Sequence, residues 1–122
     1  MSDTYSSVVI VAEPSVHQAS LRAMVDSTSL LRVVGTASGC LSALRMVQEM
    51  HPDFVLIAAN LPESEVVMFL DTVRETETAT RVIVLRKIPW HKPQLLDAGA
   101  SAVLSQDSTV TDLLAAFFSQ TP

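Results

Sequence analysis

Four polar residues could do chemistry in this chain, because each lies close behind a short apolar run: Glu13, Asn60, Arg86 and Gln106. Glu13 and Arg86 are the charged members, and two arrangements are open for them. In one, Arg86 reaches across and pairs with Glu13, and a partly buried pair of this kind would lock one conformation. In the other, both side chains point to solvent and have no role.

The rest of the chain has no arrangement of residues that is typical of an enzyme or a metalloprotein. Its three glycines, Gly35, Gly39 and Gly99, do not form a Gly-rich phosphate-binding loop. Its three histidines, His17, His51 and His91, lack the spacing of metal ligands. No serine or cysteine stands in the order of a catalytic triad along the strand ends. We therefore expect no enzymatic activity, no metal and no cofactor.

The single cysteine, Cys40, cannot form an internal disulfide. It lies in an apolar helical pattern, where a free cysteine behaves as a small hydrophobic residue. We expect a buried, unreactive thiol.

Five short apolar runs, rich in valine, isoleucine and leucine, predict the strands that must position these residues. They lie at 8–11, 31–34, 54–57, 82–85 and 102–104. Several of them are apolar without alternation, as in strands that are buried on both faces of a parallel sheet.

Helix-period segments alternate with the strands, at 16–28, 39–50, 63–75, 93–98 and 108–119. In the second of them, the pattern places Leu41, Leu44, Val47 and Met50 on one face, and Gly99 is expected to end the fourth. Five alternating strands and helices predict a three-layer, doubly wound α/β fold with a parallel sheet in the flavodoxin-like order 2-1-3-4-5.

Length and composition fit one compact domain. The chain has 122 residues, of which 48% are hydrophobic and 17% are charged. We expect a single domain over residues 1–122, with its core at about 7–118. A net charge of −5 without a basic patch argues against direct nucleic-acid binding. No apolar run approaches the ~20 residues that span a bilayer, and the first residues lack a signal-peptide pattern, so we expect a cytoplasmic protein without membrane contact.

The carboxyl ends of the first and third strands mark the expected site, because ligands of open α/β sheets bind where the strand order reverses. Ala12 and Glu13 follow the first strand, and Ala58 and Asn60 follow the third. Arg86 follows the fourth strand, and Gln106 follows the fifth.

Residues 32–39, 51–57 and 97–104, together with Leu61-Pro62, resemble the receiver domains that precede helix-turn-helix domains in NarL-type response regulators. The resemblance covers about residues 8–118 and rests on the spacing of all these segments together. It implies the same fold and a role in signal transduction.

The resemblance also implies a phosphorylation site, and this chain departs from its pattern. Where receivers carry two adjacent metal-binding acids, the chain has Ala12 and Glu13, and where they carry the phosphoacceptor aspartate it has Ala58. An alanine offers no nucleophile, and one carboxylate is a poor Mg²⁺ site. We interpret the chain as a degenerate pseudo-receiver.

Three more positions of that pattern are changed. Arg86 replaces the hydroxyl residue that ends the fourth strand, and the loop that follows is about two residues shorter than usual in the family. Gln106 replaces the lysine of the fifth strand, and Val103 replaces its aromatic switch residue.

The interaction surface is expected near the end of the chain. Trp90, between two prolines, together with Val103 and Phe118, would form an output face over the fourth strand to the fifth helix, where a homodimer or a protein partner binds. Met68 and Phe69 make the third helix apolar, so a second contact face is possible there, although core packing is the default.

We predict a phosphorylation-independent interaction module in signal transduction or transcriptional regulation. The alternative is a small-ligand sensor that uses the altered phosphorylation pocket.

Overall fold

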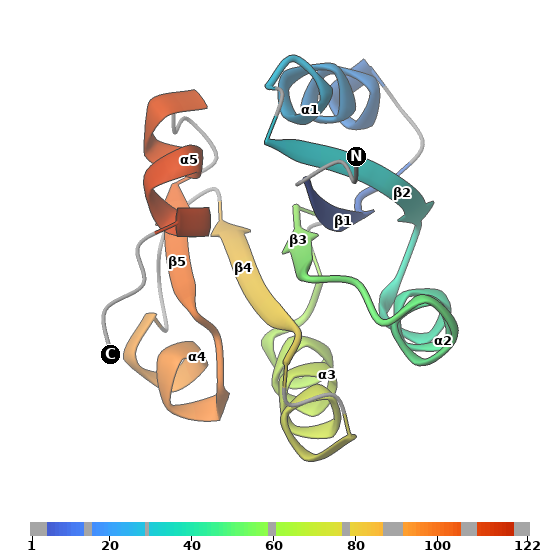
Figure 1. Ribbon diagram of the computed structural model, residues 1–122. Helices are drawn as coiled ribbons and strands as arrows, with labels where there is room; N and C mark the ends of the chain where they lie inside the picture. Colours follow the sequence, from blue (N-terminus) through green and yellow to red (C-terminus); the bar gives the residue numbers. More distant parts are fainter. Residues whose placement is uncertain are drawn as a thin grey trace.

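The computed structural model describes residues 5–13, 16–28, 30–58, 61–76, 79–86, 92–105 and 110–118. Strands and helices alternate along the whole chain (Figure 1). The elements are β1 (Ser6–Val11), α1 (Val16–Asp26), β2 (Leu31–Ala37), α2 (Cys40–Met50), β3 (Phe54–Ile57), α3 (Glu63–Thr76), β4 (Arg81–Arg86), α4 (Lys92–Ala98), β5 (Ala102–Ser105) and α5 (Val110–Phe118).

All five strands are parallel and lie in the order β2-β1-β3-β4-β5, which confirms the predicted fold class. Helices α1 and α5 cover one face of the sheet, and α2, α3 and α4 cover the other (Figure 1). Right-handed crossovers produce this arrangement, because the chain moves from β1 to β2 in one direction along the sheet and from β2 to β5 in the other.

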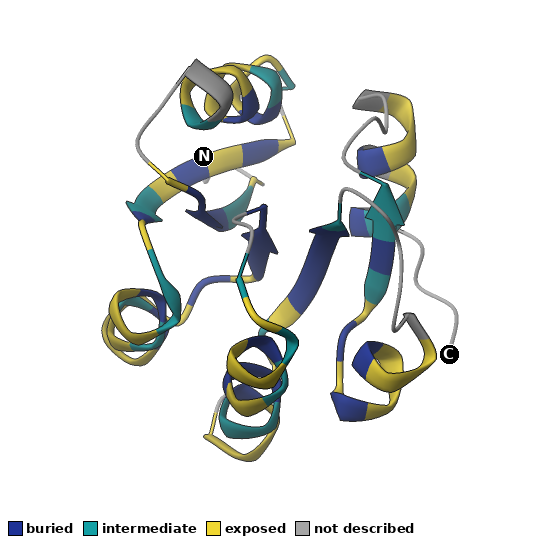
Figure 2. Cartoon of the chain, turned by 180° about the vertical axis from the view of Figure 1, so that it is seen from behind, coloured by how far each residue is buried: buried dark blue, intermediate teal, exposed yellow. Residues whose placement is uncertain are grey.

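The two faces of the sheet have separate cores because successive residues of a strand point to opposite sides. In β1, Val9 and Val11 pack toward α2, α3 and α4, whereas Val8 and Ile10 pack toward α1 and α5. Both sets are fully buried, as the dark strands of Figure 2 show. The apolar runs therefore lack alternation because both faces of these strands are covered.

Strand β2 is three residues longer than predicted. The β1–β2 register runs Val8↔Val33 and then Val9↔Gly35, so Val34 is an extra residue in β2. Such a bulge lets an edge strand continue past its apolar run, and pairing with β1 extends β2 to Ala37.

The predicted apolar face of α2 is only partly right. Val47 is buried and Leu44 is half-buried, but Leu41 is 80% exposed and Met50 is 48% exposed. Ala43 is fully buried instead. Residues 43 and 47 are one helical turn apart and define the stripe that meets the sheet, so Leu41 lies well around the helix from it.

Two helices end at a residue with a positive φ angle. Gly99 has φ +124° and ends α4, which confirms the predicted stop, since glycine adopts this conformation without steric cost. His51 ends α2 with φ 48°, and its backbone N–H donates to the Val47 carbonyl oxygen. The sequence pattern did not predict that α2 ends at His51, because residues other than glycine adopt a positive φ infrequently.

Cys40 begins α2 and is half-buried rather than fully buried, so the expected burial is only partly right. Burial, and to a smaller extent the nearby Glu65 carboxylate, raise the pKa of the Cys40 thiol. The thiol is therefore protonated at neutral pH, in agreement with an unreactive cysteine.

A prediction follows for alkylation of Cys40. At pH 8, iodoacetamide should modify the folded chain several-fold more slowly than the urea-unfolded chain, because less thiolate is present. Glu65→Gln should speed the folded-state reaction slightly, since it removes the smaller of the two causes. Mass spectrometry of timed samples measures both rates, and equal rates in the folded and unfolded chains would contradict the prediction.

Within the described segments, no helix is both long enough and apolar enough to cross a bilayer.

Candidate functional site

The carboxyl edge of the sheet brings Ala12 and Ala58 to neighbouring strand ends, as predicted. The Ala58 N–H donates to the Val11 carbonyl oxygen at 2.8 Å, which continues the β1–β3 ladder one residue beyond the strands. Ala12 and Ala58 expose only 1% and 3% of their surface, so protein atoms cover both methyl groups. Neither residue offers a nucleophile, a titratable group or a metal ligand at this point.

Gln18 is a residue of this edge that sequence reasoning missed. Its side-chain amide donates to the Ala12 carbonyl oxygen at 2.8 Å, while the Ala12 N–H donates to Ala37 at 2.9 Å. The β1–α1 connection is thus held from α1 and from β2. Its place in the first turns of α1, close to the end of β1, was the only signal available.

Arg86 does not pair with Glu13. Its guanidinium Nη1 instead donates to the Leu61 carbonyl oxygen at 3.0 Å, and Arg86 is half-buried. Glu13 is exposed. Over the residues that the structure describes, the ion pairs found are Arg22–Asp26 and Arg74–Asp71, so the first of the two arrangements, a pair across the pocket, is excluded. The alternative fails for Arg86 as well, because its guanidinium is engaged with the main chain.

The bond from Arg86 joins the end of β4 to the segment that leads into α3. Leu61 precedes Pro62, whose carbonyl oxygen accepts from Glu65 and Val66 in the first turn of α3. A hydrogen bond from a charged donor is stronger than a neutral one. Arg86 therefore positions the start of α3 relative to the sheet.

Replacing Arg86 by alanine should loosen this segment. We expect a loss of about 1 kcal/mol in the free energy of unfolding, less than the about 1.5–3 kcal/mol typical of a charged hydrogen bond, because Arg86 is partly exposed. Amide hydrogen exchange should become faster at residues 61–66. Arg81→Ala, an exposed arginine at the other end of β4, is the matched control, and equal exchange in both variants would argue against a positioning role.

No group of three or more histidine, cysteine, aspartate or glutamate side chains gathers into a possible metal site among the described residues.

Several predicted residues lie outside the part of the chain that the structure describes. These are Asn60 and Gln106 of the pocket and Trp90 of the interface. Phe118 is the last residue of α5, but its side chain is not among those described.

The structure corrects the prediction that Val103 belongs to the interface. It is 2% exposed and packs in the core cluster beneath α2, α3 and α4. As the second residue of β5, it points toward that covered face, so it supports the fold and offers no contact surface.

Comparison with known proteins assigns the family. Residues 8–118 match the response regulator receiver domain, and the chain belongs to this family. It is therefore a receiver domain of the kind found in two-component signalling. This agrees with the resemblance carried by residues 32–39, 51–57 and 97–104.

Individual relatives point to the same group. The chain is 29% identical over 109 residues to the transcriptional regulatory protein YhcZ of Bacillus subtilis, covering 88% of this chain and 51% of the relative. It is 23% identical over 114 residues to the nitrate/nitrite response regulator NarL of Escherichia coli, and the match covers 91% of this chain and 52% of NarL. The chain spans about half the length of these curated relatives.

Among solved structures, the receiver domain of the response regulator NarL from Mycobacterium tuberculosis is similar throughout. It superposes with a TM-score of 0.83 at 25% identity, and the match covers 94% of both chains.

Proposed function

We propose that this chain is a receiver that works without phosphorylation and acts by binding another protein in signal transduction or transcriptional regulation. The observation that carries the proposal is Ala58. It lies at the carboxyl end of β3, where the receiver resemblance places the phosphoacceptor aspartate, and a methyl group cannot attack phosphorus.

The neighbouring positions support the same conclusion. Ala12 ends β1 where the resemblance places a metal-binding acid, which leaves Glu13 as the remaining carboxylate of that pair. Mg²⁺ in phosphoryl sites is held by one or two carboxylates together with phosphate oxygens. With the nucleophile also absent, a single exposed carboxylate gives little reason to bind the ion.

Switching in such a receiver must come from a binding partner. A ligand shifts a two-state equilibrium only by its difference in affinity for the two states. The Arg86–Leu61 bond supports one arrangement of the segment before α3 without phosphate. We therefore propose a domain that is held in one state until a protein binds.

The proposed partner is a kinase, a regulator or an output protein in the cytoplasm. A second copy of the chain could also bind at the face from β4 to α5. For that face, light scattering of the wild type against Trp90→Ala is the test. An unchanged mass distribution would remove Trp90 from any self-association.

The small-ligand alternative is less well supported. Ala12 and Ala58 are covered by protein atoms, so a metabolite at these two methyl groups would have to displace part of the chain. A metabolite that raises the melting temperature and shifts the amide signals of these two alanines would favour the sensor.

An NMR titration tests the proposal. The ¹⁵N-labelled chain is mixed with Mg²⁺ and beryllofluoride, which mimics a phosphoryl group on aspartate. We expect no saturable shift at residues 12, 13 and 58. Saturable shifts at these residues would overturn the proposal.

A further inference from the structure

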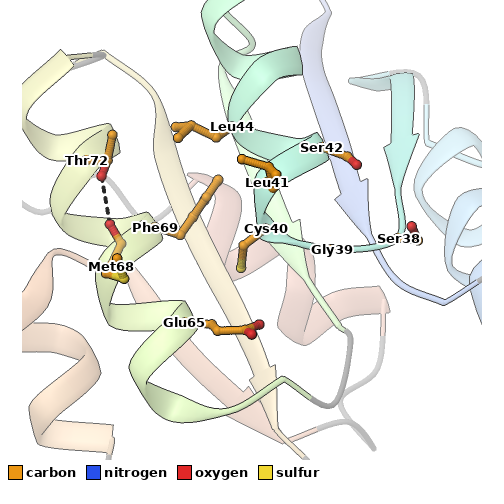
Figure 3. A pocket seen from close by; sticks show the side chains of 10 residues that line it. All are labelled: Ser38, Gly39, Cys40, Leu41, Ser42, Leu44, Glu65, Met68, Phe69 and Thr72. Atoms are coloured by element: carbon orange, nitrogen blue, oxygen red, sulfur yellow. Dashed lines mark hydrogen bonds between the residues drawn. The ribbon is translucent and has the colours of Figure 1, made fainter.

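A cleft of about 420 Å³ lies between α2 and α3, and Ser38 and Gly39 line it where the chain leaves the carboxyl end of β2 (Figure 3). Cys40, Leu41 and Leu44 line it from α2, and Glu65, Met68 and Phe69 line it from α3. The two helices pack against the same face of the sheet, and the cleft runs between their outward sides. Its walls are therefore mostly apolar, with one carboxylate.

The rims of this cleft are apolar and exposed. Leu41 is 80% exposed and Met68 is 69% exposed, the two highest values among the large hydrophobic residues that the structure describes as exposed. Phe69 beside them is buried, so α3 supplies both a core residue and an exposed one. Apolar side chains gathered around a concavity are typical of an interaction site. Methionine is also common at surfaces that accept several partners.

The charge on the two helices that form the cleft is mostly negative. Helices α2 and α3 together carry five carboxylates against two guanidinium groups. One of the two, Arg74, already donates to Asp71 and to the Asp97 carbonyl oxygen. Glu65 lies in the cleft itself, on α3 (Figure 3). An occupant with positive charge beside its apolar groups would complement this surface.

We propose that the α2–α3 cleft binds a basic amphipathic helix of a partner protein, whose apolar side chains enter between Leu41 and Met68 and whose lysine or arginine meets Glu65. A helix that lies in an apolar groove is a recurrent mode of recognition. A small molecule inside the cleft would leave the outer parts of both rims in water. A second copy of this chain would bring the same net negative surface.

This inference deepens the proposed function and rests on it, since it names the surface and the chemistry of the protein partner. The two remain separable. Peptide binding is measured without Mg²⁺ or a phosphoryl donor, so its failure leaves the argument from Ala58 in place. Phosphorylation of the chain, in turn, would not alter the peptide result.

The experiment uses the full ¹⁵N-labelled chain and two synthetic helical peptides. Both carry the same leucine stripe, flanked by lysine in one and by glutamate in the other. We expect the lysine peptide to cause saturable amide shifts concentrated on α2 and α3, with at least about tenfold higher affinity than the glutamate peptide. Leu41→Glu should weaken this binding at least about tenfold.

Matched variants locate the site. Leu30→Glu changes another exposed leucine, which is 50% exposed and precedes β2, and should leave the affinity unchanged. Glu65→Lys should reverse the preference between the two peptides. Leu41 is so exposed that its replacement should fold normally, and the NMR spectrum checks this directly.

Other results would overturn the proposal. They are no shift with about 1 mM lysine peptide, shifts centred on other elements, or equal binding by Leu41→Glu and wild type. Sedimentation of the free chain tests a second copy as occupant. A dimer that dissociates on Leu41→Glu would replace the partner helix by that copy.

Discussion

Replacing Phe117 by alanine should lower the free energy of unfolding by about 3–5 kcal/mol, one of the largest effects expected for this chain. Phe117 is fully buried on α5, and its ring meets Phe54 of β3 edge to face, with centroids 4.7 Å apart and planes at 78°. Alanine would remove the ring, its contact with Phe54 and the apolar area that joins α5 to the sheet. The cavity would lie in the core shared by α1 and α5.

Urea denaturation followed by circular dichroism measures this loss. Thr111→Ala, an exposed change on the same helix, is the control and should alter stability by no more than about 0.5 kcal/mol. A loss below about 1 kcal/mol for Phe117→Ala would mean that α5 does not pack as described.

Placing a carboxylate at position 58 has the second large expected effect. Ala58→Asp should cost about 2 kcal/mol or more at neutral pH, because the position is 3% exposed and a buried charge is unfavourable without partners. Even with the nucleophile restored, the chain should not be phosphorylated. Ala12 leaves Glu13 as the single acid of the metal-binding pair, and Gln106 stands where the resemblance places the lysine that supports the phosphoryl oxygens.

The cost of Ala58→Asp should depend on pH in a definite direction. Burial raises the pKa of an introduced carboxyl above that in the unfolded chain. The destabilisation should therefore be small in acid, where both states are protonated, and should grow as the pH rises toward the folded-state pKa. Urea midpoints at a series of pH values measure it.

Two controls separate charge from shape. Ala58→Asn has nearly the same shape without charge and should show no such dependence on pH. Combining Ala58→Asp with Arg86→Ala tests whether the guanidinium leaves Leu61 to meet the new carboxylate. If Ala58→Asp is as stable as Ala58→Asn at neutral pH and accepts a phosphoryl group, then the rest of the phosphorylation site works and our account is wrong.

The fold could be predicted from the sequence, because a strand that is buried on both faces has apolar residues at every position. The runs at 8–11, 54–57 and 82–85 are apolar throughout, and the structure covers both sides of them. Helix faces were harder to predict. Leu41 matched the apolar stripe of its helix, yet it lines an outer cleft, because a one-helix pattern does not say which apolar residues meet the sheet.

The sequence predicted which strand ends form the site, but it did not predict which side chains make contacts there. Ala12 and Ala58 lie at neighbouring strand ends as expected, since parallel strands end at one edge. The partner of Arg86 could not be inferred, because a main-chain carbonyl such as that of Leu61 has no sequence signature. Val103 was misjudged because its position in the receiver pattern suggested a surface role, whereas a small valine there packs inward.

Intact-mass spectrometry of the chain after incubation with acetyl phosphate and Mg²⁺ tests the central claim most directly. A phosphorylatable receiver treated in parallel shows that the reagent is active. Our account predicts no phosphoryl adduct on this chain, because Ala58 provides no carboxylate to accept the group. A stoichiometric, acid-stable and base-labile adduct, as expected of an acyl phosphate, would contradict it.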